Sequence, residues 1–189
     1  MTAEEPWSEH MIGRAICRQL LQSKCVVMVR NCSWTGHECD VLGVTTDLRI
    51  IDVEVKISRA DLRADSGKDK WHRLLRASEA QERGIDVSTW DPWSHREARE
   101  HPPKVWKHYY AMPAELWRPE LLEALPSAAS GVLLLSRRSG SAGEALDVRV
   151  QRRATPARDA YRLTAEQAMD VARLANLRMG DALRDTESA

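Results

Sequence analysis

Phenylalanine is absent from this chain of 189 residues, whose aromatic side chains are seven tryptophans and three tyrosines. Also absent is an apolar run of the roughly 20 residues that a membrane-spanning helix needs. The first five residues, which include Glu4 and Glu5, do not resemble the basic start of a secretory signal peptide. We therefore expect a cytoplasmic protein with no membrane partner, in which tryptophan replaces phenylalanine in packing.

Cysteine is scarce, and its four positions follow no zinc-finger or zinc-ribbon spacing. Cys17, Cys25, Cys32 and Cys39 are typical of buried free thiols in a reducing compartment. A set of three zinc ligands formed by Cys32, His37 and Cys39 is the less favoured alternative.

An excess of charge is absent as well, because 28 basic and 28 acidic residues give a formal net charge of zero. This balance argues against a protein that binds nucleic acid through its overall charge alone. The charges are nevertheless unevenly distributed, since arginines outnumber acids in residues 137–178 and acids outnumber arginines in residues 79–100. A duplex would be attracted to the first stretch and repelled by the second, unless both are simply solvated surfaces.

The sequence does contain a strand with an unusual polar face. In residues 51–57, Ile-Asp-Val-Glu-Val-Lys-Ile, apolar and charged residues alternate with a period of two. Because the side chains of a strand alternate between its faces, Asp52, Glu54 and Lys56 share one face and the aliphatic residues share the other. Residues 37–44 form a second, preceding strand, and residues 45–49 have turn character. The pattern predicts a hairpin.

The turn also sets the register of this hairpin. If the chain folds about residue 47, the numbers of opposing residues add up to about 94, which places Asp40 opposite Glu54. Two carboxylates in such positions lie roughly 5 Å apart at Cβ and repel each other. A divalent cation such as Mg²⁺ would relieve the repulsion, because it prefers carboxylate oxygens as ligands. The alternative is a polar strand face that is open to solvent, on which Lys56 neutralises Glu54.

Helical patterns flank these strands. Ser8 is a suitable N-cap for a helix over residues 8–22, and Thr164 with Gln167 predicts a capping box for a last helix over about residues 164–180. Residues 85–104 are rich in proline and tryptophan and predict an irregular insertion. Other helical segments are expected at residues 61–83, with an interruption near Ser66-Gly67, and at residues 113–124. Other strands are expected at residues 25–29, 105–112, 131–136 and 145–150. We expect one α/β domain over residues 1–189.

The acidic residues and the lysine of this hairpin resemble the motif of a known protein family. Asp40, followed after a short hairpin by Glu54-Val55-Lys56, resembles the bipartite motif of the PD-(D/E)xK nuclease superfamily. Downstream, the order of residues 56–71 and a strand ending in Ala-Met-Pro at residues 111–113 are similar to its MmcB-like DNA-repair and phage-borne branch. Unlike many members, the chain has Cys39 rather than proline before Asp40. The resemblance implies a restriction-endonuclease-like core, a central mixed sheet flanked by helices.

The resemblance also implies a catalytic site. Asp40, Glu54 and Lys56 would be its catalytic residues. Asp40 and Glu54 would hold Mg²⁺, for which Mn²⁺ could substitute, and the backbone carbonyl of Val55 would complete the metal site. Lys56 would orient the attacking water or stabilise the negative charge that develops on the phosphate.

Two further acids compete as an additional metal ligand. Glu9 begins the first helix, where related enzymes often place an acidic ligand, although an acid there also favours the helix dipole. Glu38 shares a strand face with Asp40 and is the alternative.

A short segment after the motif holds the candidates for nucleic-acid binding. Its lysines could neutralise phosphates, and phosphate contacts dominate affinity. Trp71 would stack on a base only in a single-stranded or frayed substrate, and a core position is the favoured alternative for it. The five candidates are Ser58, Arg59, Lys68, Lys70 and Trp71.

The function that this resemblance implies is a Mg²⁺-dependent deoxyribonuclease acting in DNA repair, recombination or phage DNA metabolism. Its partner would be DNA, and a homodimer or a larger DNA-processing complex would be compatible with cutting both strands. Two alternatives stay open. One is a non-cleaving nucleic-acid-binding module of the same fold, and the other is a partner-binding subunit with Trp90 and Trp93 in its interface.

Overall fold

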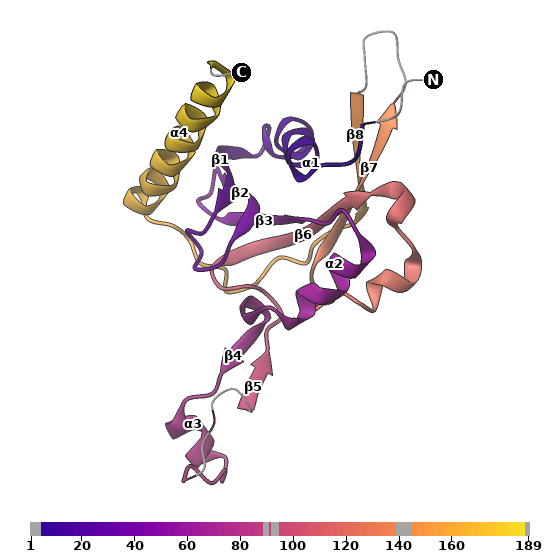
Figure 1. Ribbon diagram of the computed structural model, residues 1–189. Coiled ribbons are helices and arrows are strands. Elements are labelled where there is room, and N and C mark those ends of the chain that lie inside the picture. The colour runs from indigo at the N-terminus through magenta and orange to yellow at the C-terminus, as the bar shows by residue number, and fades with distance from the viewer. Residues whose placement is uncertain (1–4, 89–90, 92–94, 139–144, 188–189) are drawn as a thin grey trace.

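The computed structural model describes residues 5–88, 91, 95–138 and 145–187, and a mixed six-stranded sheet forms its centre (Figure 1). Along the sheet the strands follow the order β1-β2-β3-β6-β7-β8. Strands β3, β6 and β7 are parallel, whereas β1, β2 and β8 pair with antiparallel neighbours. The bounds are Cys25–Cys32 (β1), Cys39–Thr45 (β2), Ile50–Val55 (β3), Val105–Pro113 (β6), Gly131–Arg138 (β7) and Ala145–Arg152 (β8). The predicted α/β fold with a mixed central sheet is therefore confirmed.

The hairpin of β2 and β3 has the predicted register. Val41 pairs with Val53, and Val44 pairs with Ile50. The turn is closed by a hydrogen bond from the Thr45 N–H to the Arg49 carbonyl oxygen, at 2.9 Å. The same register, continued by one residue, brings Asp40 beside Glu54.

Helix α1 covers one face of the sheet. It spans Glu9–Ile16 and continues as a π-helical turn over Cys17–Leu21. The Ser8 hydroxyl caps it by accepting a hydrogen bond from the Met11 N–H at 3.2 Å, as the sequence predicts. Ile12 and Ile16 pack with Val41 and Val53 in one buried cluster. The aliphatic face of β3 thus points toward α1, and its polar face points the other way.

Helix α4, Ala165–Glu187, packs beside β1 (Figure 1). The predicted capping box is present, because the Thr164 N–H donates to Gln167 Oε1 at 2.9 Å and the Gln167 N–H donates to Thr164 Oγ1 at 3.2 Å. The prediction that this helix ends at Gly180 is wrong. Residues 181–187 include alanine, leucine and arginine, and these good helix formers outweigh one helical glycine.

A two-stranded ribbon projects from the sheet. It consists of β4 (His72–Leu74) and β5 (Arg96–Ala98), with the short helix α3 (Ala77–Glu82) at its far end (Figure 1). The helical prediction for residues 61–83 holds only for its two ends, because β4 lies between α2 (Arg59–Ala64) and α3. The insertion at residues 85–104 is not wholly irregular, since it contains β5.

Residues 113–124 also depart from the predicted helix. They form two 3₁₀ turns, Ala114–Leu116 and Pro119–Leu122, separated by the extended residues Trp117 and Arg118. Pro119 explains the break, because proline disfavours the helical conformation of the residue before it. No helix among the described residues is long and apolar enough to cross a membrane.

Tryptophan takes the packing role that phenylalanine has elsewhere. Trp71 is fully buried, and Trp34, Trp106 and Trp117 are partly buried against three apolar clusters. All four cysteines are free, although only Cys32 and Cys39 are buried.

Candidate functional site

The polar face of β3 is buried. The exposed fractions are 0% for Asp52, 2% for Glu54 and 2% for Lys56. The alternative of a strand face open to solvent is therefore wrong. In the parallel pairing of β3 with β6, Asp52 lies beside His108 and Glu54 lies beside Tyr110. Two carboxylates are thus enclosed in the interior, where a charge without a partner is costly.

Three lysines surround Glu54. The Nζ atoms of Lys56 and Lys68 lie 3.3 and 3.5 Å from Glu54 Oε2. Lys70 donates a hydrogen bond to the other oxygen, Oε1. Lys56 reaches Glu54 from the same strand, whereas Lys68 and Lys70 come from the 3₁₀ turns that follow α2.

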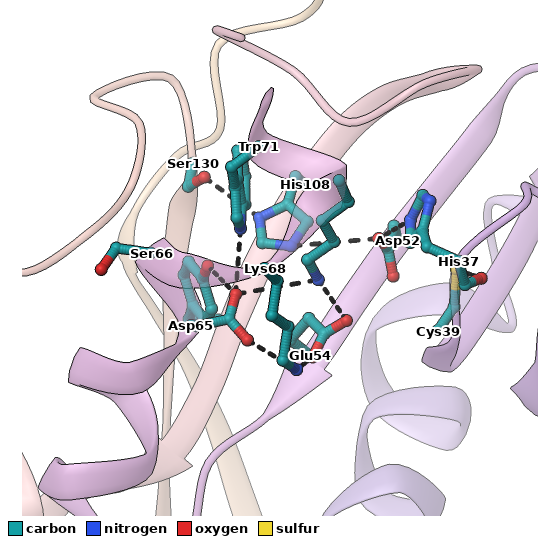
Figure 2. Close-up of polar contacts among 12 residues, drawn as sticks. His37, Cys39, Asp52, Glu54, Asp65, Ser66, Lys68, Trp71, His108 and Ser130 are labelled. Atoms are coloured by element: carbon teal, nitrogen blue, oxygen red, sulfur yellow. Dashed lines mark hydrogen bonds and ion pairs between the residues drawn. The ribbon is translucent and has the colours of Figure 1, made fainter. Parts of the chain in front are cut away.

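Asp65 is the second acid of this cluster. Its carboxylate lies 2.9 Å from Lys56 Nζ and 2.7 Å from Lys68 Nζ. It also accepts hydrogen bonds from the Tyr110 hydroxyl at 2.5 Å and from Trp71 Nε1 at 3.0 Å. Figure 2 shows Asp65 and Glu54 on either side of Lys68. We call Glu54, Lys56, Asp65, Lys68 and Lys70 the lysine cluster.

The charges of the lysine cluster support one another. Burial alone would raise the pKa of Asp65, but Lys70, Lys68, Tyr110 and Lys56 together hold it well below its usual range. Burial alone would lower the pKa of Lys56, yet Asp65 and Glu54 raise it overall. Lys56 also lies 3.7 Å from the partly exposed Asp61 carboxylate, so three ammonium groups face three carboxylates and their charges balance.

Asp40 lies at the edge of this arrangement. Its Oδ2 accepts a hydrogen bond from the Val55 N–H at 2.7 Å. Burial, followed by the neighbouring Glu54 carboxylate, raises the pKa of Asp40 to about 6. Asp40 also lines a small surface pocket together with Glu9 and Arg30. The structure therefore brings Asp40, Val55, Glu54 and Glu9 into one neighbourhood, with Glu9 on its solvent side.

Asp40 and Glu54 have the donor chemistry that Mg²⁺ prefers, because both offer carboxylate oxygens. Burial and the neighbouring Glu54 carboxylate raise the pKa of Asp40, and a divalent cation bound there would favour its anion. The donor set thus suits Mg²⁺ at Asp40. At Glu54 the ion would compete with the three ammonium groups that already hold the carboxylate.

The proposed nucleic-acid contacts are placed unequally. Trp71 is only 1% exposed and packs edge-on against His108, so stacking on a base is wrong for it and the core interpretation holds. Lys70 is likewise buried against Glu54 and is not available to a phosphate. Lys68 differs, since 49% of its side chain is exposed.

Ser58 and Arg59 have structural partners. The Ser58 hydroxyl caps α2 by accepting a hydrogen bond from the Asp61 N–H at 3.1 Å. Arg59 Nε donates to the Leu116 carbonyl oxygen at 2.7 Å. Both side chains are half-buried, so a phosphate contact would use the part that stays exposed. Trp90 and Trp93 lie outside the described residues.

No family model and no curated protein matches this chain. Among solved structures, the chain is similar to a protein of unknown function from Silicibacter pomeroyi, with a TM-score of 0.53 and 22% sequence identity. The match covers 98% of this chain and 95% of the other. At this level of identity the similarity concerns the fold alone.

A second polar group lies next to the lysine cluster on the same face of β3. His37 Nε2 is 3.1 Å from Asp52 Oδ2, and His108 Nε2 is 3.9 Å from the same oxygen. Figure 2 shows Asp52 between the two imidazole rings, with Cys39 near His37. The donor atoms of His37, Cys39 and Asp52 lie within 4.8 Å of one another. We call His37, Cys39, Asp52 and His108 the imidazole cluster.

Sequence reasoning missed Asp65 and His108 as site residues. Asp65 follows α2 and precedes two lysines, and His108 lies on β6 between Lys107 and Tyr109. Because His108 shares a strand face with the buried Tyr110, a histidine at that position is the signal that could have indicated it. For Asp65 the nearby lysines are the local signal, but its contacts with Lys56 and Tyr110 depend on the fold.

Proposed function

We propose that this protein is a metal-dependent nuclease with a restriction-endonuclease-like core, which hydrolyses the phosphodiester bonds of DNA. One observation carries the proposal. Across the β2–β3 hairpin, the Asp40 carboxylate binds the Val55 backbone N–H at 2.7 Å, next to Glu54 and one residue before Lys56. These are the residues of the motif in the sequence, and they lie close together where β3 ends.

The proposed hydrolysis requires positive charge next to the phosphate. When bound by Asp40, Glu54 and the backbone carbonyl of Val55, Mg²⁺ would polarise the phosphate and lower the pKa of a water molecule. Lys56 has a raised pKa because Asp65 and Glu54 stabilise its ammonium form. It therefore stays protonated at neutral pH, and its role is to stabilise negative charge rather than to remove a proton.

The lysine cluster also offers a contact for a polyanionic substrate. Its members Lys56 and Lys70 are buried, in a setting of low dielectric where electrostatic attraction is stronger than in water. Lys68 is the member that reaches the surface and thus the one that could contact a phosphate. Repair, recombination or phage DNA metabolism is the setting we propose, with DNA as partner and a homodimer or larger complex as the assembly for cutting both strands.

A specific observation favours a second candidate, a nucleic-acid-binding module that does not cleave. Both oxygens of Glu54 are already held by lysines of the same chain. If Mg²⁺ does not displace any of them, Asp40 is the motif carboxylate left for the ion, with the Val55 carbonyl and the exposed Glu9 nearby. Water would then fill more of the coordination of Mg²⁺, and the protein would hold it less firmly.

The test compares wild-type protein with Lys56→Ala, Asp40→Asn and the control Lys24→Ala. Lys24 is an exposed lysine in the turn before β1 and has no part in the site. Each protein is incubated with supercoiled plasmid, linear duplex, single-stranded and forked DNA, with Mg²⁺, Mn²⁺ or chelator. We expect metal-dependent cleavage by wild type and Lys24→Ala, and a loss on the order of 10²–10³-fold in the two site variants.

The outcomes separate the candidates. Cleavage that survives Lys56→Ala and Asp40→Asn would mean that the activity arises elsewhere or from a contaminant. Binding of DNA by wild type without cleavage of any substrate in either metal would favour the non-cleaving module. Circular dichroism of each variant verifies that it is folded.

A further inference from the structure

The imidazole cluster contains buried atoms that lack partners. Asp52 Oδ1 and His108 Nε2 are buried, and neither has a hydrogen-bond partner among the residues that the structure describes. Asp52 is 0% exposed and His108 1% exposed, so bulk water does not satisfy them. Buried polar atoms are nearly always paired, so two orphans that belong to adjacent side chains require an explanation.

The arrangement of His108 indicates what is missing. Its Nδ1 lies 3.0 Å from Ser130 Oγ, which fixes the ring, and its Nε2 points toward Asp52 without reaching hydrogen-bond distance. Whichever nitrogen carries the proton, Nε2 stays without a partner. A histidine that ligates a metal through one nitrogen usually has its other nitrogen bonded to the protein in this way.

The distances between the donor atoms are close to those found around a bound metal ion. Donors that lie 2.0–2.3 Å from a tetrahedral zinc ion are about 3.3–3.7 Å from one another. The two histidine nitrogens lie 3.1 and 3.9 Å from Asp52 Oδ2 and so bracket this range. Cys39 Sγ lies within 4.8 Å of the donor atoms of His37 and Asp52, and His108 joins these three through Asp52, with which it shares a second group of donors that includes Glu54.

We propose that His37, Cys39, Asp52 and His108 form a structural site for a zinc-class transition-metal ion. Nitrogen and sulfur donors select such ions over Mg²⁺, which distinguishes this site from the oxygen donors of Asp40 and Glu54. The site is closed, because Cys39 and Asp52 are fully buried and the His37 side chain is only 12% exposed. A closed site without an open coordination position is typical of structural rather than catalytic zinc.

The ion would join three parts of the fold. His37 and Cys39 lie where the chain enters β2, Asp52 lies on β3, and His108 lies on β6. The spacing of these residues matches no familiar zinc motif, because the last two ligands come from separate strands of one sheet. The site is independent of the proposed nuclease activity and can exist whether or not the protein cleaves DNA.

The test measures metal content and stability together. Full-length protein is stripped with chelator, loaded with Zn²⁺ or Co²⁺ under reducing conditions and freed of excess metal. We expect about one ion per chain by mass spectrometry of the metal and a thiolate-to-Co²⁺ charge-transfer band. In a separate sample, to which zinc is added back in large excess, we expect a Tm about 5–10 °C higher than in chelator.

Four variants make the assignment specific. Cys39→Ser and His37→Gln should reduce the bound zinc about tenfold or more and remove the charge-transfer band or shift it. The controls Cys32→Ser and His101→Gln, which change a buried cysteine and a histidine outside the site, should bind as wild type does. His37 lies at the rim, so His37→Gln decides the question if Cys39→Ser does not fold.

Either of two results would overturn the proposal. Wild-type protein that binds neither metal, or site variants that retain wild-type zinc, would show that these residues do not form the site. Asp40→Asn should keep its zinc, so a failure of this proposal is distinguishable from a failure of the nuclease proposal.

Discussion

Asp52 and Glu54 lie two residues apart on one buried face of β3, but they differ in the number of positively charged groups around them. Three ammonium groups hold Glu54. In the part of the chain that the structure describes, neither lysine nor arginine pairs with Asp52, and its partner is the His37 imidazole at 3.1 Å. A buried carboxylate needs positive charge close by. The chain itself therefore provides this charge for Glu54, whereas at Asp52 the proposed metal ion would provide it.

The largest effect should come from removing a central acid of the lysine cluster. Asp65→Asn leaves the buried Lys56 and Lys70 and the half-exposed Lys68 with one central acid, Glu54, and we expect the free energy of unfolding at pH 7 to fall by about 3–5 kcal/mol. Asp61→Asn is the matched control. Its side chain is 41% exposed and lies 3.7 Å from Lys56, so it should change stability by less than about 1 kcal/mol. Urea denaturation measures both.

The pH dependence of the stability difference between wild type and Asp65→Asn tests whether electrostatic attraction causes it. The pKa of Asp65 is lower in the folded protein than in the unfolded chain, so its contribution is present above the unfolded value of about 3.9 and is lost as the pH falls toward the folded value. The stability difference between wild type and Asp65→Asn should therefore be full at pH 7 and narrow below about pH 4. A difference that is independent of pH would contradict the electrostatic explanation.

The next largest loss of stability should differ between Lys70 and Lys68, which both contact Glu54. Lys70→Met removes a side chain that is 3% exposed, and we expect a loss of about 2–4 kcal/mol. Lys68→Met removes one that is 49% exposed, and solvent screening should limit the loss to less than about 1 kcal/mol. Thermal and urea unfolding of both variants provide the measurement. Equal losses would show that burial does not set the strength of these ion pairs.

The smallest effect should appear at Asp52, and its sign is informative. In chelator, Asp52→Asn removes a poorly compensated charge while keeping the shape, so we expect stability to stay unchanged or to rise by about 1–2 kcal/mol. With zinc present, the variant should lack the increase in Tm that wild type shows. A loss of 3 kcal/mol or more in chelator would mean that the chain alone compensates Asp52.

The sequence predicts those parts of the fold in which neighbours along the chain determine geometry. The period of two in residues 51–57 and the turn near residue 47 are enough to derive the register that the pairing of Val41 with Val53 confirms. The Thr164–Gln167 capping box is equally local. In residues 113–124 the helical prediction is wrong because Pro119 outweighs the surrounding helix formers.

The site is less predictable, because long-range contacts decide what its residues do. The spacing of Asp40, Glu54 and Lys56 makes them candidates from the sequence alone, but nothing near Asp65 in the sequence indicates that it contacts Tyr110. The burial of Lys70 is equally unexpected, since a lysine is usually exposed unless a partner compensates its charge. Only the folding of the 3₁₀ turns over β3 and β6 brings that partner, Glu54, within reach.

The ribbon of β4 and β5 begins directly after the lysine cluster. At its base, the Arg99 N–H donates to the Trp71 carbonyl oxygen at 2.8 Å, and Arg99 Nε donates to the His72 carbonyl oxygen at 3.0 Å. Beyond these bonds, the ribbon and α3 extend away from the sheet (Figure 1). Exposed tips of this kind tolerate insertions and exchanges. The tip can therefore be lengthened or replaced without moving the residues around Glu54, so a change of this surface need not disturb the interior.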